Sequence, residues 1–139
     1  KFAKCCTPVP GDPVIGFITK GYGISIHKQD CPNVISGLNN PIYANRWLNA
    51  RWETAVSASN EFEAQIRIVA QPDIRLIADI TMALADMKVS LLGITTRNRD
   101  DCTIVELAVT CRNLDHFRSI MSRLRSVPKV ESVSRGYTA

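Results

Sequence analysis

Long uncharged apolar segments are missing from this sequence of 139 residues. Its most apolar stretch, residues 77–94, is interrupted by Asp79, Asp86 and Lys88, whereas a membrane-spanning helix needs about 20 nearly uncharged residues. We therefore expect no membrane span. The sequence also begins with Lys1 rather than Met and shows no basic-then-apolar leader. We expect a piece of a longer protein, with no signal peptide within these 139 residues.

A dense cysteine scaffold is missing too. The five cysteines, an odd number, are Cys5, Cys6, Cys31, Cys102 and Cys111. Small secreted domains that depend on disulfides carry many closely spaced cysteines, so this pattern favours reduced thiols in the cytoplasm. The 45% apolar and 22% charged residues are typical of an ordinary folded domain rather than a disordered chain.

A large excess of charge of one sign is also lacking, because the formal net charge is +4. The small excess is uneven: residues 1–60 carry six basic and three acidic residues, and residues 61–139 carry eleven and ten. A mild basic excess is compatible with a polyanionic partner such as RNA, and it is equally common on plain solvated surfaces.

Glycine and proline are concentrated in the first part, where ten of the fourteen lie before residue 42. Short elements joined by turns are expected there: strands at residues 14–18 and 23–27, a helix from Pro32 through Leu38, and a strand at residues 46–52. That last strand would place Trp47 and Trp52 on opposite faces. The small polar segment 55–60 predicts a linker between a small α/β module at residues 1–54 and a second domain at residues 61–139.

The second domain shows clearer periods. Residues 62–70 alternate apolar and polar side chains and predict a half-buried strand, and two further strands are expected at 88–98 and 102–111, with a closing strand after Pro128. Helical spacing predicts one helix that starts near Pro72 or Asp73 and another that follows Asn113, a good N-cap. Their expected apolar stripes are Ile77, Ile80, Leu84 and Met87, and Leu114, Phe117, Ile120, Met121 and Leu124. The order βαββαβ predicts an α+β, ferredoxin-like fold with both helices on one face of an antiparallel sheet.

The adjacent thiols of Cys5 and Cys6 raise a question of chemistry. His27 lies 21 positions after Cys6 and Cys31 four positions after His27, so thiols and an imidazole could meet if the first two strands fold back on the start of the chain. Three Cys and one His form a suitable ligand set for a zinc ion, Zn²⁺. Zinc sites usually separate paired cysteines by two or more residues, however, and adjacent ligands must splay apart. Small buried thiols therefore remain an open alternative.

The other cysteines and the helix end allow two further expectations. Cys31 at the start of a helix would have its thiolate favoured by the helix dipole. Cys102 and Cys111 are nine positions apart on one predicted strand, so they lie on opposite faces, and we expect neither to bind a metal.

A group of basic and aromatic residues in the first module has the ingredients of an RNA-binding patch. Lysines and arginines contact phosphates, glycines expose backbone amides, and a tyrosine offers a stacking face. The candidate RNA-binding residues are Lys20, Tyr22, Lys28, Arg46 and Arg51. A solvated hairpin tip has the same composition, so both interpretations stay open.

The motifs of the first module occur together in one order: paired cysteines, the turn "PVPGD", the turn "TKGYG" and the segment "HKQDCPN". This combination closely resembles the zinc-finger-like cysteine module near the C-terminus of long RelA/SpoT-type (p)ppGpp synthetase/hydrolase enzymes, and the following domain resembles the ACT domain that ends those proteins. The resemblance implies that Cys5, Cys6, His27 and Cys31 are the zinc-finger residues. It also implies that the catalytic domains lie upstream and that both modules dock on ribosomal RNA when the enzyme senses uncharged tRNA.

The resemblance implies a small-ligand site as well. In ACT domains an amino acid binds between the first strand and the first helix, and the corresponding residues here are Asp73, Ile74 and Arg75. Arg75 stands where the family pattern has a glycine that lets the backbone approach the ligand, which speaks against amino-acid binding.

The leading hypothesis is a regulatory fragment without catalysis of its own, controlling (p)ppGpp synthesis and hydrolysis in the stringent response. Ribosomal RNA, tRNA, an amino acid and a second copy of the chain are the expected partners, with a homodimer formed by paired ACT sheets. Two alternatives stay open. One is a stand-alone amino-acid-sensing ACT regulator, and the other is a thiol enzyme that uses Cys5 or Cys6 with His27 as base.

Overall fold

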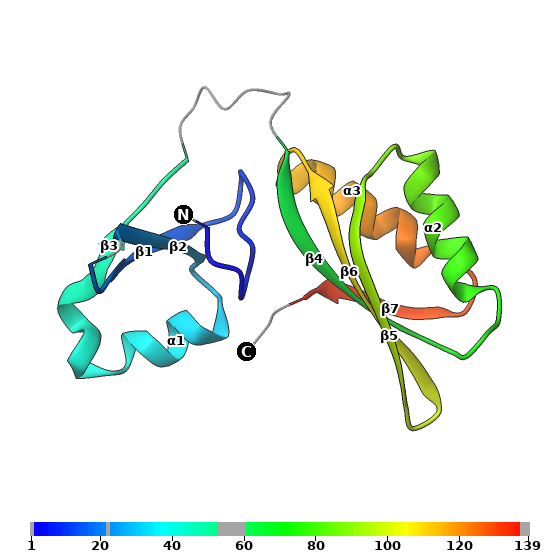
Figure 1. Cartoon of the computed structure of the whole chain (residues 1–139), viewed down its shortest axis with the longest axis horizontal. Helices are drawn as coiled ribbons and strands as arrows, with labels where there is room; N and C mark the ends of the chain where they lie inside the picture. Colours follow the sequence, from blue (N-terminus) through cyan, green and yellow to red (C-terminus); the bar gives the residue numbers. More distant parts are fainter. Residues whose placement is uncertain (1, 22, 53–60, 137–139) are drawn as a thin grey trace.

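The computed structural model describes residues 2–21, 23–52 and 61–136 and shows two α+β modules beside one another (Figure 1). The linker expected at residues 55–60 lies outside the described residues. In the described part of the chain no helix is long and apolar enough to cross a membrane.

The first module is a three-stranded antiparallel sheet of order β2-β1-β3 with short helices beside it. Its elements are β1 (Val14–Thr19), β2 (Gly23–Lys28), α1 (Pro32–Leu38), the 3₁₀ helix η1 (Pro41–Arg46) and β3 (Trp47–Asn49). Gly21 and Gly23 adopt the positive φ values, 72° and 99°, that the tight turn between β1 and β2 requires. The first two strands and α1 were therefore predicted correctly from turn residues and local patterns.

The strand expected at residues 46–52 is wrong in length. Arg46 ends η1 and only Trp47–Asn49 pair with β1, so Trp52 lies outside any strand. The reason is local, because Pro41 opens a short helix and the Asn40 side chain accepts a hydrogen bond from the Ile42 N–H at 3.0 Å.

The second module has the predicted order βαββαβ. Its elements are β4 (Phe62–Ala70), α2 (Leu76–Asp86), β5 (Leu91–Arg99), β6 (Cys102–Cys111), α3 (Leu114–Arg125) and β7 (Val130–Arg135). The strands form one antiparallel sheet of order β5-β6-β4-β7, and both helices cover the same face (Figure 1). The ferredoxin-like arrangement is confirmed.

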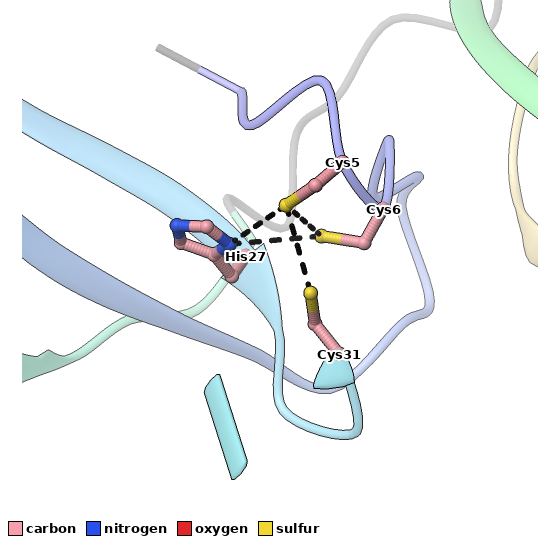
Figure 2. Close-up of side chains that lie close together, drawn as sticks. All are labelled: Cys5, Cys6, His27 and Cys31. Atoms are coloured by element: carbon pink, nitrogen blue, oxygen red, sulfur yellow. Dashed lines mark hydrogen bonds between the residues drawn. The ribbon is translucent and has the colours of Figure 1, made fainter. Parts of the chain in front are cut away.

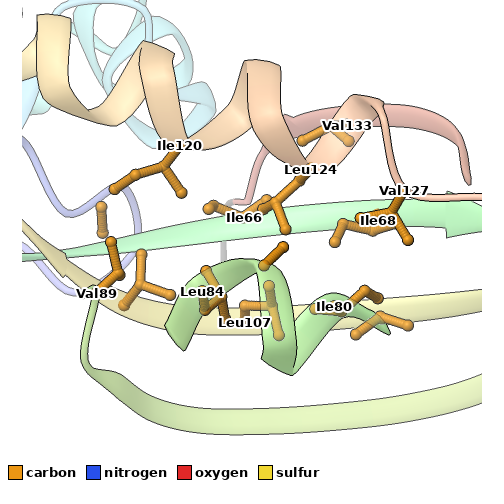
Figure 3. Close-up of a cluster of buried hydrophobic side chains, with 14 of the residues drawn as sticks. Ile66, Ile68, Ile80, Leu84, Val89, Leu107, Ile120, Leu124, Val127 and Val133 are labelled. Atoms are coloured by element: carbon orange, nitrogen blue, oxygen red, sulfur yellow. The ribbon is translucent and has the colours of Figure 1, made fainter. Parts of the chain in front are cut away.

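A single apolar layer between this sheet and its helices holds the second module together (Figure 3). Alternation along β4 directs Ala64, Ile66, Ile68 and Ala70 into the layer, where all four are fully buried. From α2 and α3 come Ile80, Leu84, Ile120 and Leu124, also buried. Asn113 caps α3 as predicted, since its side chain accepts a hydrogen bond from the His116 N–H at 2.8 Å.

Helix α2 starts later than predicted and turns a different face to the sheet. The Asp73 carboxylate accepts a hydrogen bond from the Arg75 N–H at 2.7 Å, which holds residues 73–75 in a turn, and the helix begins only at Leu76. As a result Leu76 is 2% exposed in the core whereas Ile77, expected on the apolar stripe, is 37% exposed.

Two alanine substitutions test this face. Leu76→Ala leaves a cavity beneath α2 and is expected to lower the free energy of unfolding by about 2–5 kcal/mol. The matched change Ile77→Ala removes a partly exposed side chain and is expected to cost less than about 1 kcal/mol. Urea unfolding followed by circular dichroism measures both, and a larger loss for Ile77→Ala would contradict the described register of the helix.

Candidate metal centre

Three thiols and one imidazole from separate segments converge in the first module (Figure 2). Cys5 and Cys6 lie in the N-terminal turn, His27 on β2, and Cys31 at the N-cap of α1. The Cys5 Sγ lies 3.4 Å from the His27 Nδ1, 3.6 Å from the Cys31 Sγ and 3.9 Å from the Cys6 Sγ. The Cys6 Sγ lies 3.8 Å from the same nitrogen.

A tight backbone turn lets adjacent cysteines face one point. The Thr7 N–H donates a hydrogen bond of 3.0 Å to the Ala3 carbonyl, which closes one helical turn around Cys5 and Cys6. Thr7 then leaves that turn with a φ of 40°, in the left-handed region that a β-branched residue rarely adopts. Adjacent cysteines can bind one metal only if their side chains splay toward a common point. The turn and the strained backbone of Thr7 provide this geometry.

The other two ligands are placed by secondary structure. Strand β2 ends at Lys28, and the Cys31 N–H donates to the Lys28 carbonyl at 3.1 Å, so the chain turns directly from His27 into α1. A Cβ on Gly37 of α1 would lie 2.6 Å from the Trp47 ring, so glycine permits close packing of the helix on β3.

Two further contacts orient the site and were missed from the sequence. The Ser25 hydroxyl lies 3.4 Å from the His27 Nε2, on the ring edge opposite the thiols, and such an outer partner fixes the ring of a metal-binding histidine. Ser25 and His27 are two apart on β2 and share a face, so strand periodicity could have revealed this pair. The Lys28 N–H donates to the Cys6 Sγ at 3.3 Å, which only the folded backbone shows.

Burial controls the protonation of the cluster. Desolvation raises the pKa of the Cys6 thiol far above its usual value, and although the Lys28 N–H bond opposes the effect, it is outweighed. Desolvation also raises the pKa of Cys31. The backbone amides of Asn33 and Val34 at the helix start act in the opposite direction, as expected, but burial outweighs them. Burial lowers the pKa of His27. In the absence of a cation these groups are neutral at pH 7.

Four of the six separations between the ligand atoms are close to those of a tetrahedral zinc site. Bond lengths of about 2.3 Å for Zn–S and about 2.0 Å for Zn–N give tetrahedral edges of about 3.8 Å between two sulfurs and about 3.5 Å between sulfur and nitrogen. The corresponding separations in the structure are 3.6 and 3.9 Å between sulfurs and 3.4 and 3.8 Å between sulfur and nitrogen. All four ligand atoms lie within 4.8 Å of one another, so Cys5, Cys6, His27 and Cys31 could hold one metal ion, and three thiols with one imidazole suit Zn²⁺.

The remaining cysteines lie on β6 of the second module. Cys111 is buried at the end of β6, where desolvation raises the pKa of its thiol to about 11. Cys102 begins the same strand, partly exposed, with its Sγ 3.5 Å from a Glu131 carboxylate oxygen that raises the pKa of this thiol. Neither belongs to the group of ligands that the described residues bring together.

The candidate RNA-binding residues do not form one exposed group. Lys28 is buried, with its Nζ 3.2 Å from the Asp30 carboxylate, whereas Lys20 and Arg51 are exposed. Arg46 donates from Nε to the Ile18 carbonyl at 2.8 Å and stacks 4.6 Å from the centre of the Phe17 ring. Tyr22 lies outside the described residues.

The candidate ligand residues border a cavity on the helical side of the second module. Asp73 and Arg75 line this space of about 510 Å³ together with residues of α2 and α3, among them Asp86 and Arg123. Ile74 is fully exposed and is not among the lining residues. Of the three predicted residues, the structure thus brings two to one cavity.

The two halves of the chain match two different domain families. Residues 1–53 match the RelA/SpoT RIS domain, and residues 58–135 match the ACT domain. The fold and the cysteine cluster therefore define a two-domain regulatory region, in which a RIS domain precedes an ACT domain. The chain belongs to the RelA/SpoT family, as the motifs of its first module indicated.

Similarity to whole proteins agrees with this membership. The bifunctional (p)ppGpp synthase/hydrolase RelA of Mycobacterium tuberculosis is 38% identical over 97% of this chain, and a GTP pyrophosphokinase of Streptomyces coelicolor is 36% identical over the same share. A guanosine-3′,5′-bis(diphosphate) 3′-pyrophosphohydrolase of Aquifex aeolicus is 32% identical. The chain spans only 16–18% of the length of these curated relatives.

A solved structure supports the assignment of the second module. The solution structure of the ACT domain from the GTP pyrophosphokinase of Chlorobium tepidum superposes with a TM-score of 0.50 and 25% sequence identity. It covers 57% of this chain and 90% of that domain.

Proposed function

We propose that this chain is the regulatory region of a (p)ppGpp synthetase/hydrolase, that it has no catalysis of its own, and that it controls catalytic domains elsewhere in the full-length protein. The observation that carries the proposal is the match of nearly the whole chain to one small part of much longer enzymes. That match favours a region of such an enzyme over a stand-alone amino-acid sensor. The described cysteines are all free, which suits a reducing compartment such as the cytoplasm.

We propose that the cluster holds a structural Zn²⁺ rather than serving as a thiol nucleophile. Four protein ligands would close the coordination shell, as in structural sites, whereas catalytic zinc keeps one position open for water or substrate. A catalytic cysteine needs a lowered pKa, but burial raises the pKa of Cys6 and Cys31. Bound zinc would supply the positive charge that lets these buried thiols ionise, and it would join the N-terminal turn, β2 and α1.

Zinc binding is predicted to tighten steeply with rising pH. Cys6 and Cys31 are protonated at neutral pH because their pKa values are raised, so each must release a proton on binding, whereas His27, with its lowered pKa, releases none. With at least two protons released, the apparent affinity rises about a hundredfold per pH unit near neutrality. Competition titrations with a zinc chelator measure this slope.

Two serine variants complete that test. Cys6→Ser removes one ligand and is expected to abolish stoichiometric zinc binding, while Cys102→Ser leaves it unchanged because Cys102 lies outside the cluster. An affinity independent of pH, or full binding by Cys6→Ser, would rule out the proposed site.

We propose that the exposed basic residues of the first module contact ribosomal RNA. Lys20 and Arg51 are exposed, and residues 1–60 carry most of the excess positive charge. Lys20→Glu combined with Arg51→Glu is expected to weaken co-sedimentation of the full-length protein with ribosomes about tenfold or more and to flatten its dependence on salt. Arg99→Glu with Arg118→Glu, an equal charge change on exposed residues of the second module, serves as the control. A first-module variant that co-sediments as well as wild type would contradict contact through the first module.

We propose that the chain self-associates through β5. This nine-residue strand ends the sheet order and exposes all its residues, including the apolar Leu91, Leu92 and Ile94, so a second copy could pair with its open edge. Leu92→Asp is expected to shift the chain from dimer to monomer in sedimentation velocity. Met82→Asp, at an equally exposed apolar site on α2, is expected to leave it dimeric. A wild-type chain that sediments as a monomer would refute this surface.

A further inference from the structure

Residues 7–12, which we call the docking loop, follow Cys6 directly and lie against the ACT domain (Figure 1). Val9 of this loop is fully buried and belongs to the same apolar cluster as Ile66 and Phe117. A side chain of the first module thus completes the core of the second. Separating the modules would expose that end of the core to water.

A buried ion pair fixes the loop. The Asp12 carboxylate accepts two hydrogen bonds from the Arg135 guanidinium of β7, at 2.8 and 3.1 Å, and the side chains are 3% and 10% exposed. The same guanidinium donates to the Thr7 carbonyl at 3.0 Å and lies 4.6 Å from the centre of the Phe117 ring. A bidentate pair is strong in this setting, and removing one partner would leave the other charge buried and uncompensated.

The backbone adds a second anchor at the start of α3. The Leu114 N–H, one of the donors that a helix leaves without an internal acceptor, donates to the Pro10 carbonyl of the loop at 2.7 Å. A Cβ on Gly11 would lie 2.8 Å from the Leu114 Cβ, and Gly11 has a φ of 106°, so glycine permits this approach. The Leu114 amide therefore reports directly whether the loop is docked.

Thr7 joins the metal ligands directly to the anchors of the docking loop. Thr7 donates its N–H to Ala3 in the turn that holds Cys5 and Cys6, and its carbonyl accepts from Arg135. Its φ of 40° sets the direction of both segments at once. A rotation about this φ changes the position of the cysteine turn relative to the carbonyl that accepts from Arg135.

We propose that the docking loop couples the cysteine cluster to the ACT domain, so that metal binding by Cys5 and Cys6 stabilises the docked state at Asp12, Arg135 and the start of α3. The effect of metal on docking rests on the proposed zinc site. Because linkage is reciprocal, undocking the loop weakens zinc binding by the same factor by which zinc strengthens docking. Metal binding by the cluster thereby stabilises β7, the edge strand of the ACT sheet that bears Arg135.

Hydrogen–deuterium exchange measured by NMR on the whole chain tests the coupling. Stripping zinc with a chelator is expected to lower the protection of the Leu114 amide about tenfold, while the Leu107 amide in the middle of β6 changes less than about twofold. Asp12→Asn is expected to lower Leu114 protection likewise and to weaken zinc binding about tenfold. Asp86→Asn, which removes an exposed ion pair with Arg123, changes neither quantity.

The outcomes separate the two proposals. If the chain binds zinc but Leu114 protection is unaffected by stripping, or Asp12→Asn binds zinc as wild type does, the coupling is wrong and the zinc site stands. If the chain binds no zinc, the zinc site is wrong, and the rate of Cys6 alkylation then tests the coupling. Alkylation of Cys6 that is about fivefold faster in Asp12→Asn than in wild type supports the coupling, and an unchanged rate overturns it. If Asp12→Asn does not fold, Arg135→Lys, which keeps the charge but loses the bidentate geometry, replaces it in every arm.

Discussion

The turn formed by residues 3–7 is the constraint on which the rest of this molecule depends. Adjacent cysteines can face a single point only because the Thr7 N–H closes a helical turn on Ala3 and because Thr7 accepts a left-handed backbone. The same backbone geometry directs the docking loop toward the ACT domain, where Val9 is buried in the apolar core. Backbone strain of this kind persists only where surrounding contacts hold it. At Thr7 these contacts are the N–H bond to Ala3 and the carbonyl bond from Arg135.

The two modules differ in how much apolar core each has. The first module has little apolar core of its own, a small group around Cys6, Cys31 and Val34, whereas the second has a continuous layer. A small module of that kind usually needs a metal or a neighbouring domain for stability, and this one has both a suitable ligand set and a docked partner. Under the proposed coupling, a change at one module would therefore alter the stability of the other.

Local patterns predicted most of the fold, because the decisive signals lie within a few residues, whereas the four members of the cluster were expected from the spacing of the first two strands and from the family resemblance. Strict alternation marked β4 and an asparagine cap marked α3. The start of α2 was missed because an aspartate turn holds the chain before Leu76. The burial of Lys28 and the pairing of Asp12 with Arg135 could not be predicted, because those contacts join positions whose partners are set by the tertiary fold and not by spacing.

X-ray absorption at the zinc edge, recorded on the chain purified with its metal retained, tests the central claim most directly. The account predicts one zinc per chain whose first shell contains three sulfurs at about 2.3 Å and one nitrogen at about 2.0 Å. A first shell made only of nitrogen and oxygen, or a chain that carries no zinc when it is folded, would contradict the claim that Cys5, Cys6, His27 and Cys31 form a metal centre.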